Sequence, residues 1–385
     1  MTELAVLARL SADSQHPVEQ LVRHPRLPLV AGTAAKSRLV RVWDCGGGRL
    51  HEFAPVDLGP AREPDPAEWW RSETAPPVAW HPEQPLLVVA DGSTLTRWTP
   101  DGPSVPEQVS AAYLHLAFSP DGRTLWAKPS GDSSDALDLA TGSAVPAPYW
   151  DTGVAVHPSG ELVATLVSDQ SATFCLFARP GAEPPAAMRQ LRHALVLAAD
   201  GYGTPLFSAD GRHLAVRGNA YVDSLDVFAF PSLRRVLTRT LAEDDAQRWP
   251  DENLAWGVRP GVLWIGTPTG SLLELDVETQ QTVEHPSPAG APISALTATA
   301  SGDLLVAHAD GALALLAERP TASAPEVADG VAVFLAETEE LPPNAEYEED
   351  LVVTDGTDTW GADADGRPGP CRSRCCEVGR HHALE

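Results

Sequence analysis

Three cysteines and two histidines gather in the last fifteen residues of the 385-residue chain, where they could bind a metal ion: Cys371, Cys375, Cys376, His381 and His382. Zinc favours such thiolate and imidazole ligands in tetrahedral sets. The spacing matches no known zinc motif, and two adjacent cysteines are poorly placed to bind one ion together. We therefore predict a disordered terminus over residues 367–385, with zinc binding and redox sensing as alternatives. We assign no metal site and no cofactor.

Three further histidines occupy one position in a repeated turn, each directly before a proline: His24, His81 and His157. A closed array of repeats would spread them around one rim, far from each other. We expect them to cap strand ends rather than to bind a metal ion. The sequence also has no Walker phosphate loop, no GxSxG motif and no HExxH motif. We therefore name no catalytic residue.

Three of the eleven tryptophans lie outside the apolar strands, in connections rich in acidic residues and proline: Trp69, Trp70 and Trp249. Tryptophan is enriched at the positions that dominate protein–protein binding, where truncation costs about 2 kcal/mol or more. We predict these three as partner-binding residues. The alternative is that each folds back as a lid over the edge of a sheet.

A turn phrase that recurs seven times predicts the elements that position these residues. Each copy has a strand end, a turn of Pro, Gly, Asp or Ser, and a second apolar strand, and a third strand follows about ten residues later. Repeats of this period are typical of stacked or radial arrays. The seven copies lie at 23–32, 80–91, 118–127, 156–165, 207–216, 257–266 and 299–307.

These repeats predict an all-β chain that forms a single β-propeller, with seven four-stranded blades over residues 1–320. The last repeat has no clear fourth strand, so we predict that the N-terminal strand at 3–9 completes it and closes the ring. Two strand-like segments of the tail, 331–337 and 350–360, could instead build an incomplete eighth blade. Long connections are expected at 54–77, 182–205 and 231–253.

The segment RLVRVWD at 38–44, with its Trp43–Asp44 pair, and the seven turns resemble the WD40-type β-propeller family over roughly residues 3–320. The repeats are degenerate, because one blade alone keeps the Trp-Asp pair and the family's Gly-His pair is not evident. The resemblance implies a rigid platform that assembles other proteins, usually without catalysis.

Charge narrows the choice of partner. The net charge of −26 disfavours nucleic acid and anionic membranes, which require a basic surface. Half of this charge lies between Glu326 and Asp365, where thirteen acidic residues occur without a lysine or arginine. We predict an acidic tail over residues 321–366, with one or two extra strands.

No signal peptide or membrane-length apolar segment is evident, so we expect a cytoplasmic protein. The excess of arginine over lysine indicates a GC-rich bacterial genome.

These observations favour a non-catalytic platform that binds protein partners. The alternatives are a propeller hydrolase or lactonase with a site at the central channel, and a sensor that binds a small molecule or peptide there.

Overall fold

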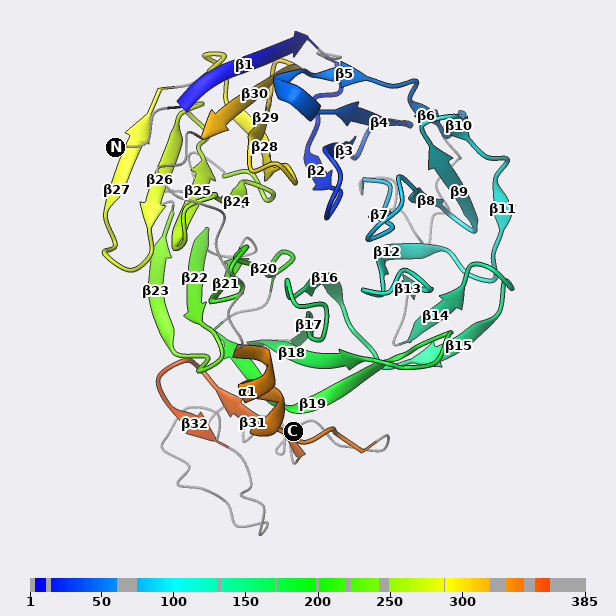
Figure 1. The fold of residues 1–385 in the computed structure, drawn as a ribbon, viewed down its shortest axis with the longest axis vertical. Coiled ribbons are helices and arrows are strands. Elements are labelled where there is room, and N and C mark those ends of the chain that lie inside the picture. The colour runs from blue at the N-terminus through cyan, green and yellow to red at the C-terminus, as the bar shows by residue number, and fades with distance from the viewer. Residues whose placement is uncertain are drawn as a thin grey trace, which may run out of the picture.

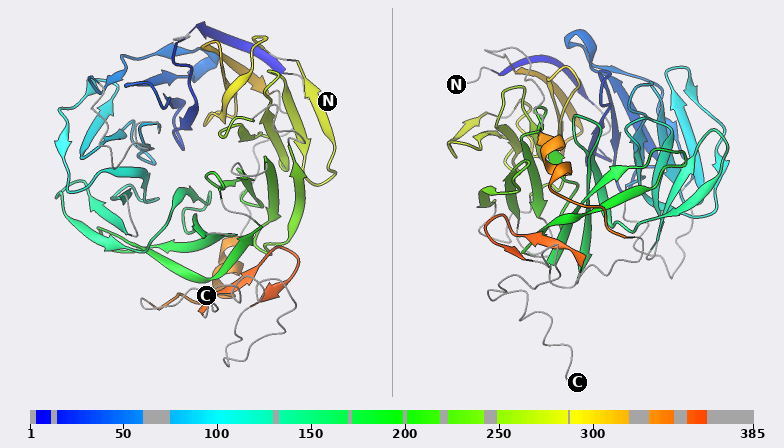
Figure 2. Two further views of the ribbon diagram at one scale, coloured as in Figure 1. Left: turned by 180° about the vertical axis from the view of Figure 1, so that it is seen from behind. Right: turned by 60° about the horizontal axis from the view of Figure 1, so that its bottom comes forward.

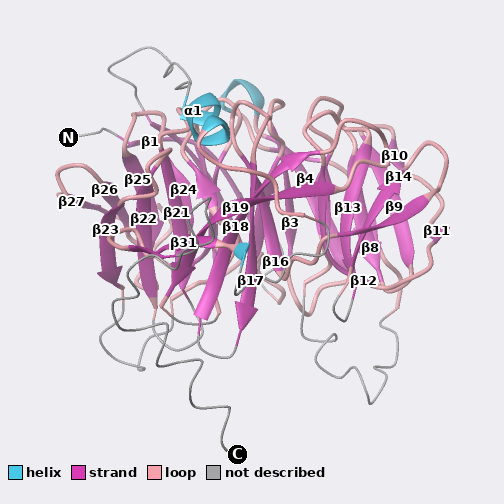
Figure 3. Ribbon diagram, turned by 90° about the horizontal axis from the view of Figure 1, so that it is seen from below, coloured by secondary structure: helices cyan, strands magenta, loops and turns pink. Residues whose placement is uncertain are grey.

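Seven β-sheets stand side by side around a central axis in the computed structural model (Figure 1). The structure describes residues 4–11, 15–60, 75–129, 133–169, 172–198, 201–218, 223–241, 249–286, 288–318, 330–342 and 350–360. The view from behind and the view from the side show the same ring, with strands running along its axis (Figures 2 and 3). The chain is therefore a seven-bladed β-propeller, as the repeats predict.

Each blade is built on antiparallel strands, and its first strand lies nearest the axis. Blade 1 contains β2 (Gln20–Arg23), β3 (Leu29–Thr33), β4 (Leu39–Asp44), β5 (His51–Glu52) and β6 (Val56–Asp57). Blade 2 contains β7 (Val78–Trp80), β8 (Leu87–Asp91), β9 (Thr94–Thr99), β10 (Gly102–Pro103) and β11 (Glu107–Gln108). In both blades the fourth strand is split into two short pieces. A 3-10 turn, η1 (Gly46–Gly48), joins β4 to β5.

The next two blades differ in size. Blade 3 contains β12 (Tyr113–Phe118), β13 (Thr124–Pro129), β14 (Ser134–Asp138) and β15 (Ala144–Ala147). Blade 4 contains β16 (Thr152–Val156), β17 (Val163–Asp169), β18 (Ala172–Pro180) and β19 (Met188–Leu197), and the tail adds β31 (Val352–Thr354) and β32 (Thr359–Trp360) to it.

The remaining blades are four-stranded. Blade 5 contains β20 (Leu206–Phe207), β21 (His213–Gly218), β22 (Ser224–Ala229) and β23 (Arg235–Thr240). Blade 6 contains β24 (Leu254–Trp256), β25 (Val262–Gly266), β26 (Leu272–Asp276) and β27 (Thr282–His285). Blade 7 contains β28 (Ile293–Ala298), β29 (Leu304–His308), β30 (Ala312–Glu318) and the N-terminal strand β1 (Leu4–Ser11).

Ring closure by the N-terminal strand is confirmed. Strand β1 pairs antiparallel with β30, from Leu4 opposite Glu318 to Ser11 opposite Ala312. In Figure 1 it crosses the outside of blade 7 and ends beside blade 1. The first and last repeats are therefore held together by backbone hydrogen bonds rather than by side chains alone.

Two predictions about the tail and the connections are wrong. The segment at 331–337 forms a helix, α1 (Gly330–Ala336), because Val331 and Phe334 share one helical face that packs against blades 4 and 5. The described residues of the tail build no eighth blade, since β31 and β32 extend blade 4. The expected long connections at 182–205 and 231–253 contain β19 and β23, the fourth strands of their blades.

Apolar side chains fill the spaces between neighbouring blades. Tryptophans supply much of this packing, and Trp43, Trp98, Trp126 and Trp264 are almost completely buried. Two of the hydrophobic clusters show the pattern, because each joins strands of consecutive blades. The ring therefore has a series of cores between blades, as expected when a single sheet cannot bury both faces.

The turn histidines cap strand ends, as predicted. The Nδ1 atoms of His24 and His81 each accept two backbone N–H groups of their own turn. The Nε2 atom of His24 donates to the carbonyl oxygen of Gln84 in the next blade at 2.8 Å. His81 instead covers Gly122 of blade 3, where a Cβ atom would lie 2.2 Å from its Nε2 atom. Each ring therefore ties one blade to the next.

Burial lowers the pKa of both His24 and His81, which favours the neutral form that this capping needs. No helix in the described part of the chain is long and apolar enough to cross a membrane.

Candidate functional site

The outer strand of blade 7 is the longest outer strand that no other described strand covers. Strand β1 has eight residues, whereas the outer strands of blades 3, 5 and 6 have four to six. It pairs with β30 on one side, and no described residue pairs with its other side. An exposed strand edge offers unpaired backbone N–H and C=O groups to a further strand.

Two apolar side chains of β1 face solvent. Val6 is 47% exposed and Leu7 is 40% exposed, so they are among the few large apolar side chains on the described surface. A β-bulge interrupts the pairing with β30 between Val6 and Ala8, which leaves Leu7 without a partner across the ladder. Bulges redirect side chains and often lie next to functional sites. Here the bulged residue faces a cavity.

The cavity lies where the outside of blade 7 meets blade 1 and has a volume of about 570 Å³. Ligand pockets typically have volumes of about 300–1,000 Å³. Leu7 and Leu50 supply apolar walls, and Asp44, Arg49 and His51 supply polar groups. The cavity therefore offers both apolar and polar contacts beside β1.

The floor of the cavity is fixed by the turn after β4. Asp44 accepts a hydrogen bond from the Gly46 N–H at 2.8 Å, and the Arg49 N–H donates to the Gly46 carbonyl oxygen. Gly47 and Gly48 have φ values of 63° and 69°, which favour glycine. The glycine run is thus a turn. We call the open side of β1 together with this cavity the β1 edge.

Of the predicted partner-binding tryptophans, the structure describes Trp249, which lies between blades 5 and 6 and away from the β1 edge. Trp69 and Trp70 fall outside the described residues. Trp249 is half-buried, packs against the cluster between blades 5 and 6, and donates its backbone N–H to Asp223 at 3.2 Å. This contact fixes the backbone beside Trp249, and its role in binding stays a prediction. The terminal cysteines and histidines at 371–382 also lie outside the described residues.

Sequence reasoning missed the β1 edge, although a signal was present. The segment LAVLARL has apolar residues at consecutive positions, so one strand places apolar side chains on both of its faces. One face packs on blade 7, and the other must meet solvent or a partner.

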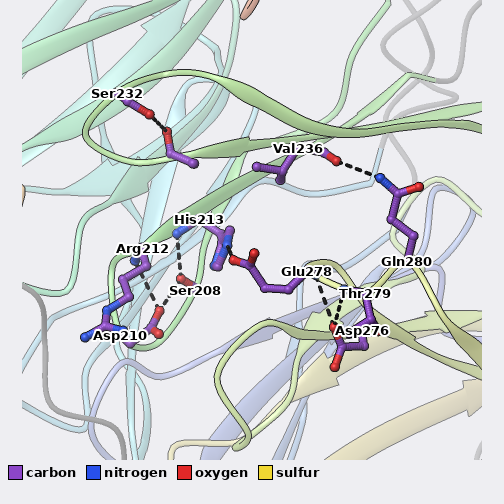
Figure 4. A network of polar contacts seen from close by, with 11 residues as sticks. Ser208, Asp210, Arg212, His213, Ser232, Val236, Asp276, Glu278, Thr279 and Gln280 are labelled. Carbon is purple, nitrogen blue, oxygen red and sulfur yellow. Dashed lines mark hydrogen bonds and ion pairs between the residues drawn. The ribbon is translucent and has the colours of Figure 1, made fainter.

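A polar network between blades 5 and 6 contains the residue types of a hydrolytic site (Figure 4). His213 contacts Glu278 at 2.9 Å through Nε2 and stacks on Trp256. The Ser208 hydroxyl donates to Asp210 at 2.6 Å and accepts the backbone N–H of His213 at 3.0 Å. The serine is therefore oriented toward a carboxylate and a backbone group, not toward the imidazole of His213.

The same turn recurs in blade 3. There Ser119 donates to Asp121 at 2.6 Å and accepts the backbone N–H of Thr124 at 3.0 Å. Thr124 occupies the place that His213 has in blade 5. Because the serine–aspartate pair repeats without the histidine, we assign it to the architecture of the turn.

Two groups on or next to the innermost strands have strongly altered pKa values. Burial lowers the pKa of His115, on the innermost strand β12, to about 4, although Asp151 opposes the shift. Burial and the neighbouring Asp251 raise the pKa of Glu252, just before the innermost strand β24, to about 7. Such shifts cluster at functional sites. The hydrolase alternative would depend on groups of this kind and stays a prediction.

Comparison of the sequence with models of known protein families finds no match, and neither does comparison with curated proteins.

Proposed function

We propose that this protein is a non-catalytic platform, a degenerate propeller of the WD40 type that binds protein partners in the bacterial cytoplasm. The resemblance of its turns and of the Trp43–Asp44 strand to that family supports this assignment. The ring itself is consistent with it, because a closed propeller presents rigid edges and loops on all sides.

The β1 edge is the observation that carries the proposal. An open strand of eight residues, with Val6 and Leu7 exposed beside a cavity of about 570 Å³, has the features needed for strand addition. In this mode main-chain hydrogen bonds supply affinity, and pockets for alternate side chains supply specificity. The partner that fits is an extended segment of another protein, with an apolar side chain that enters the cavity beside Leu7.

The test compares the wild type with a Val6→Glu/Leu7→Glu variant in affinity capture from the native host, followed by mass spectrometry. Val105→Glu is the matched control, because Val105 is 83% exposed and lies in blade 2, away from β1. We expect one set of partners to be lost from the β1 variant and kept by the control. If both variants keep the same partners, binding at the β1 edge is refuted.

The predicted tryptophans are tested in the same experiment with a Trp69→Ala/Trp70→Ala variant and a Trp249→Ala variant. Partners lost from these variants but kept by the β1 variant would place the interface on the long connections instead.

A further inference from the structure

The outer strand of blade 4 is covered by the acidic tail. Along β19, the Arg192 N–H donates to the Glu339 carbonyl oxygen at 2.9 Å, and the Leu341 N–H donates to the Gln190 carbonyl oxygen at 2.8 Å. Farther along, β31 pairs in parallel with His193, Ala194 and Leu195. Two pieces of the tail therefore follow the same edge, the first as a β-bridge and the second as an added strand.

An aromatic anchor holds the tail beside this strand. Phe334 of α1 is 3% exposed, and its ring centroid lies 5.0 Å from that of Phe177 and 5.2 Å from that of Phe230. Val331, one turn earlier on the helix, is buried in the same cluster. Figures 1 and 3 place α1 at the ends of the strands, on one face of the ring and next to β18. The helix thus fills a hollow between two blades.

Four arginines of blades 4 and 5 contact the tail: Arg179, Arg189, Arg192 and Arg235. Arg189 pairs with Glu340 at 3.1 Å, and Arg192 pairs with Glu339 at 3.5 Å. Arg179 donates to the carbonyl oxygen of Leu335 at 3.1 Å. Arg235 donates its backbone N–H to Gly356 and its guanidinium to the carbonyl oxygen of Asp355. Arg189 and Arg192 therefore match acidic side chains of the tail, whereas Arg179 and Arg235 hold its backbone, and together they favour an acidic segment on this surface.

The tail is additional to the blade that it covers. Blade 4 has four strands of its own, β16 to β19, as the complete blades 3, 5, 6 and 7 have. Release of the tail would leave the repeat intact and would expose the edge of β19, the arginines and the apolar hollow around Phe177. We call this surface the blade 4–5 groove.

We propose that the blade 4–5 groove is a second docking site, which takes an acidic extended segment with an aromatic anchor from a partner protein, and that the tail is its intramolecular competitor. The ligand chemistry is defined by the present occupant: a helical turn with a phenylalanine, then glutamates that bridge to β19 at Leu191, then a short strand that pairs with it. Two independent features support it, the charge complementarity and the complete blade underneath. The site is separate from the β1 edge, so each proposal can fail without the other.

Competition follows from tethering. A segment on the same chain is present at a high effective concentration, typically of millimolar order for short connections. An external segment of equal intrinsic affinity therefore binds poorly until the tail is released. A partner gains access by binding more tightly or by arriving when tail docking is weakened.

The test uses a fluorescent peptide of residues 330–360 as the probe, with fluorescence anisotropy as the readout. The full-length chain is compared with a Val331→Asp/Phe334→Asp variant, in which the tail's own anchor is removed. We expect the variant to bind the probe at least tenfold more tightly than the wild type does. Equal affinity for a variant shown to be folded by circular dichroism would overturn the proposal.

Two controls test the chemistry of the groove. Arg189→Glu/Arg192→Glu in the anchor-deleted chain should weaken probe binding at least tenfold, whereas Arg123→Glu, an exposed arginine of blade 3, should leave it unchanged. A scrambled probe of equal composition should bind at least tenfold more weakly. Equal binding of the scrambled probe, or no effect of the groove arginines, would overturn the proposal because the groove would then lack specificity.

Hydrogen exchange on the unmodified protein gives a second measurement, which holds even if the anchor variant fails to fold. We expect backbone amides of α1 and β31 to exchange at least tenfold faster than those of β18, because the tail can open while the blade stays closed. Equal exchange rates would show that the tail opens only when the blade unfolds. A separate measurement of molecular mass at several protein concentrations checks for a dimer, which would show that a second copy's tail is the occupant. Either result would overturn the proposal.

Discussion

The two longest outer strands of the ring, β19 and β1, differ in what lies along their outer edges. Strand β19 has ten residues and is covered by the tail through hydrogen bonds, ion pairs and the Phe334 anchor. Strand β1 has eight residues, and no described residue covers it. One edge has an occupant from the same chain, and the other has a cavity in its place.

The side chains of the two strands match this difference. On β19, Arg189 and Arg192 face acidic residues of the tail, and Ala194 packs against Leu351, so the covered edge has both ion pairs and apolar contacts. On β1, Val6 and Leu7 are exposed and the bulge at Leu7 interrupts the ladder. Bulges and charges are the usual means by which proteins protect an edge from indiscriminate pairing. Strand β1 therefore combines a bulge, which limits indiscriminate pairing, with the exposed apolar side chains that our proposal of a binding edge requires.

The largest expected effect on the free energy of unfolding comes from removing β1, because β1 closes the ring whereas the tail is only added to it. Deleting residues 4–11 should lower the free energy of unfolding by more than about 3 kcal/mol, a large part of the total for a typical domain. The reason is that β1 covers Leu313 and Leu315 of blade 7. Chemical denaturation measures this loss. A change smaller than that for deleting residues 330–385 would reverse the roles that we assign to the two segments.

The second effect concerns the anchor of the tail. Phe334→Ala should weaken tail docking by about 2–4 kcal/mol, since truncating a buried phenylalanine leaves a cavity and loses contacts. The main unfolding transition should change less, because the tail can detach on its own. Val333→Ala is the control, since Val333 is 48% exposed on the same helix. Hydrogen exchange in β31 measures docking, and equal effects of both variants would contradict the assignment.

The third effect concerns the ion pairs of the covered edge. Arg189→Ala and Arg192→Ala should each weaken docking by about 0.5–1 kcal/mol, because both pairs are partly exposed to solvent. The effect should shrink at high salt. Exchange rates of the tail amides that do not depend on salt would show that charge does not hold the tail in place.

The fourth effect is a pH dependence of tail docking, which we expect at β19 and not at β1. Burial lowers the pKa of His193, on β19 under Phe334, although Glu337 opposes the shift, and Arg192 lowers it further. A lowered histidine pKa contributes stability that is present above the unfolded value of about 6.5 and is lost as the pH falls below it. Tail docking should therefore weaken on acidification, and His193→Gln should reduce this dependence. If tail docking in the variant depends on pH as it does in the wild type, groups other than His193 cause this dependence.

The smallest effect on stability is expected at the open edge. Val6→Glu/Leu7→Glu should change the free energy of unfolding by no more than about 0.5 kcal/mol, as is usual for exposed positions. The same variant should lose its partner. Thermal denaturation beside the capture experiment checks both statements, and a large loss of stability would show that these side chains serve folding instead.

Much of the fold could be predicted because its signals are local. The turn residues that join the first two strands of each blade are read directly from short segments, and the clasp follows from the one repeat that lacks a fourth strand. The helix α1 could not be predicted, since a short apolar run is ambiguous between helix and strand. Its form depends on Phe334 packing against Phe177 and Phe230, residues more than one hundred positions away.

The sites depend on tertiary placement as well. Strand β19 carries arginines and a histidine that interrupt the alternation of polar and apolar residues typical of a strand. The acidic partner of Arg189, Glu340, lies 151 positions later in the sequence, so their contact could not be predicted. The exposure of Val6 and Leu7 depends on which face of β1 meets blade 7, and the sequence does not specify this.

The most direct test of the account places a photoreactive phenylalanine analogue at Leu7 in the full-length protein within its native host. Illumination should give one discrete adduct at Leu7, which disappears when Val6→Glu is added, and no matching adduct when the analogue is placed at Val105. The same adducts at both positions, or none at Leu7, would contradict binding at the β1 edge.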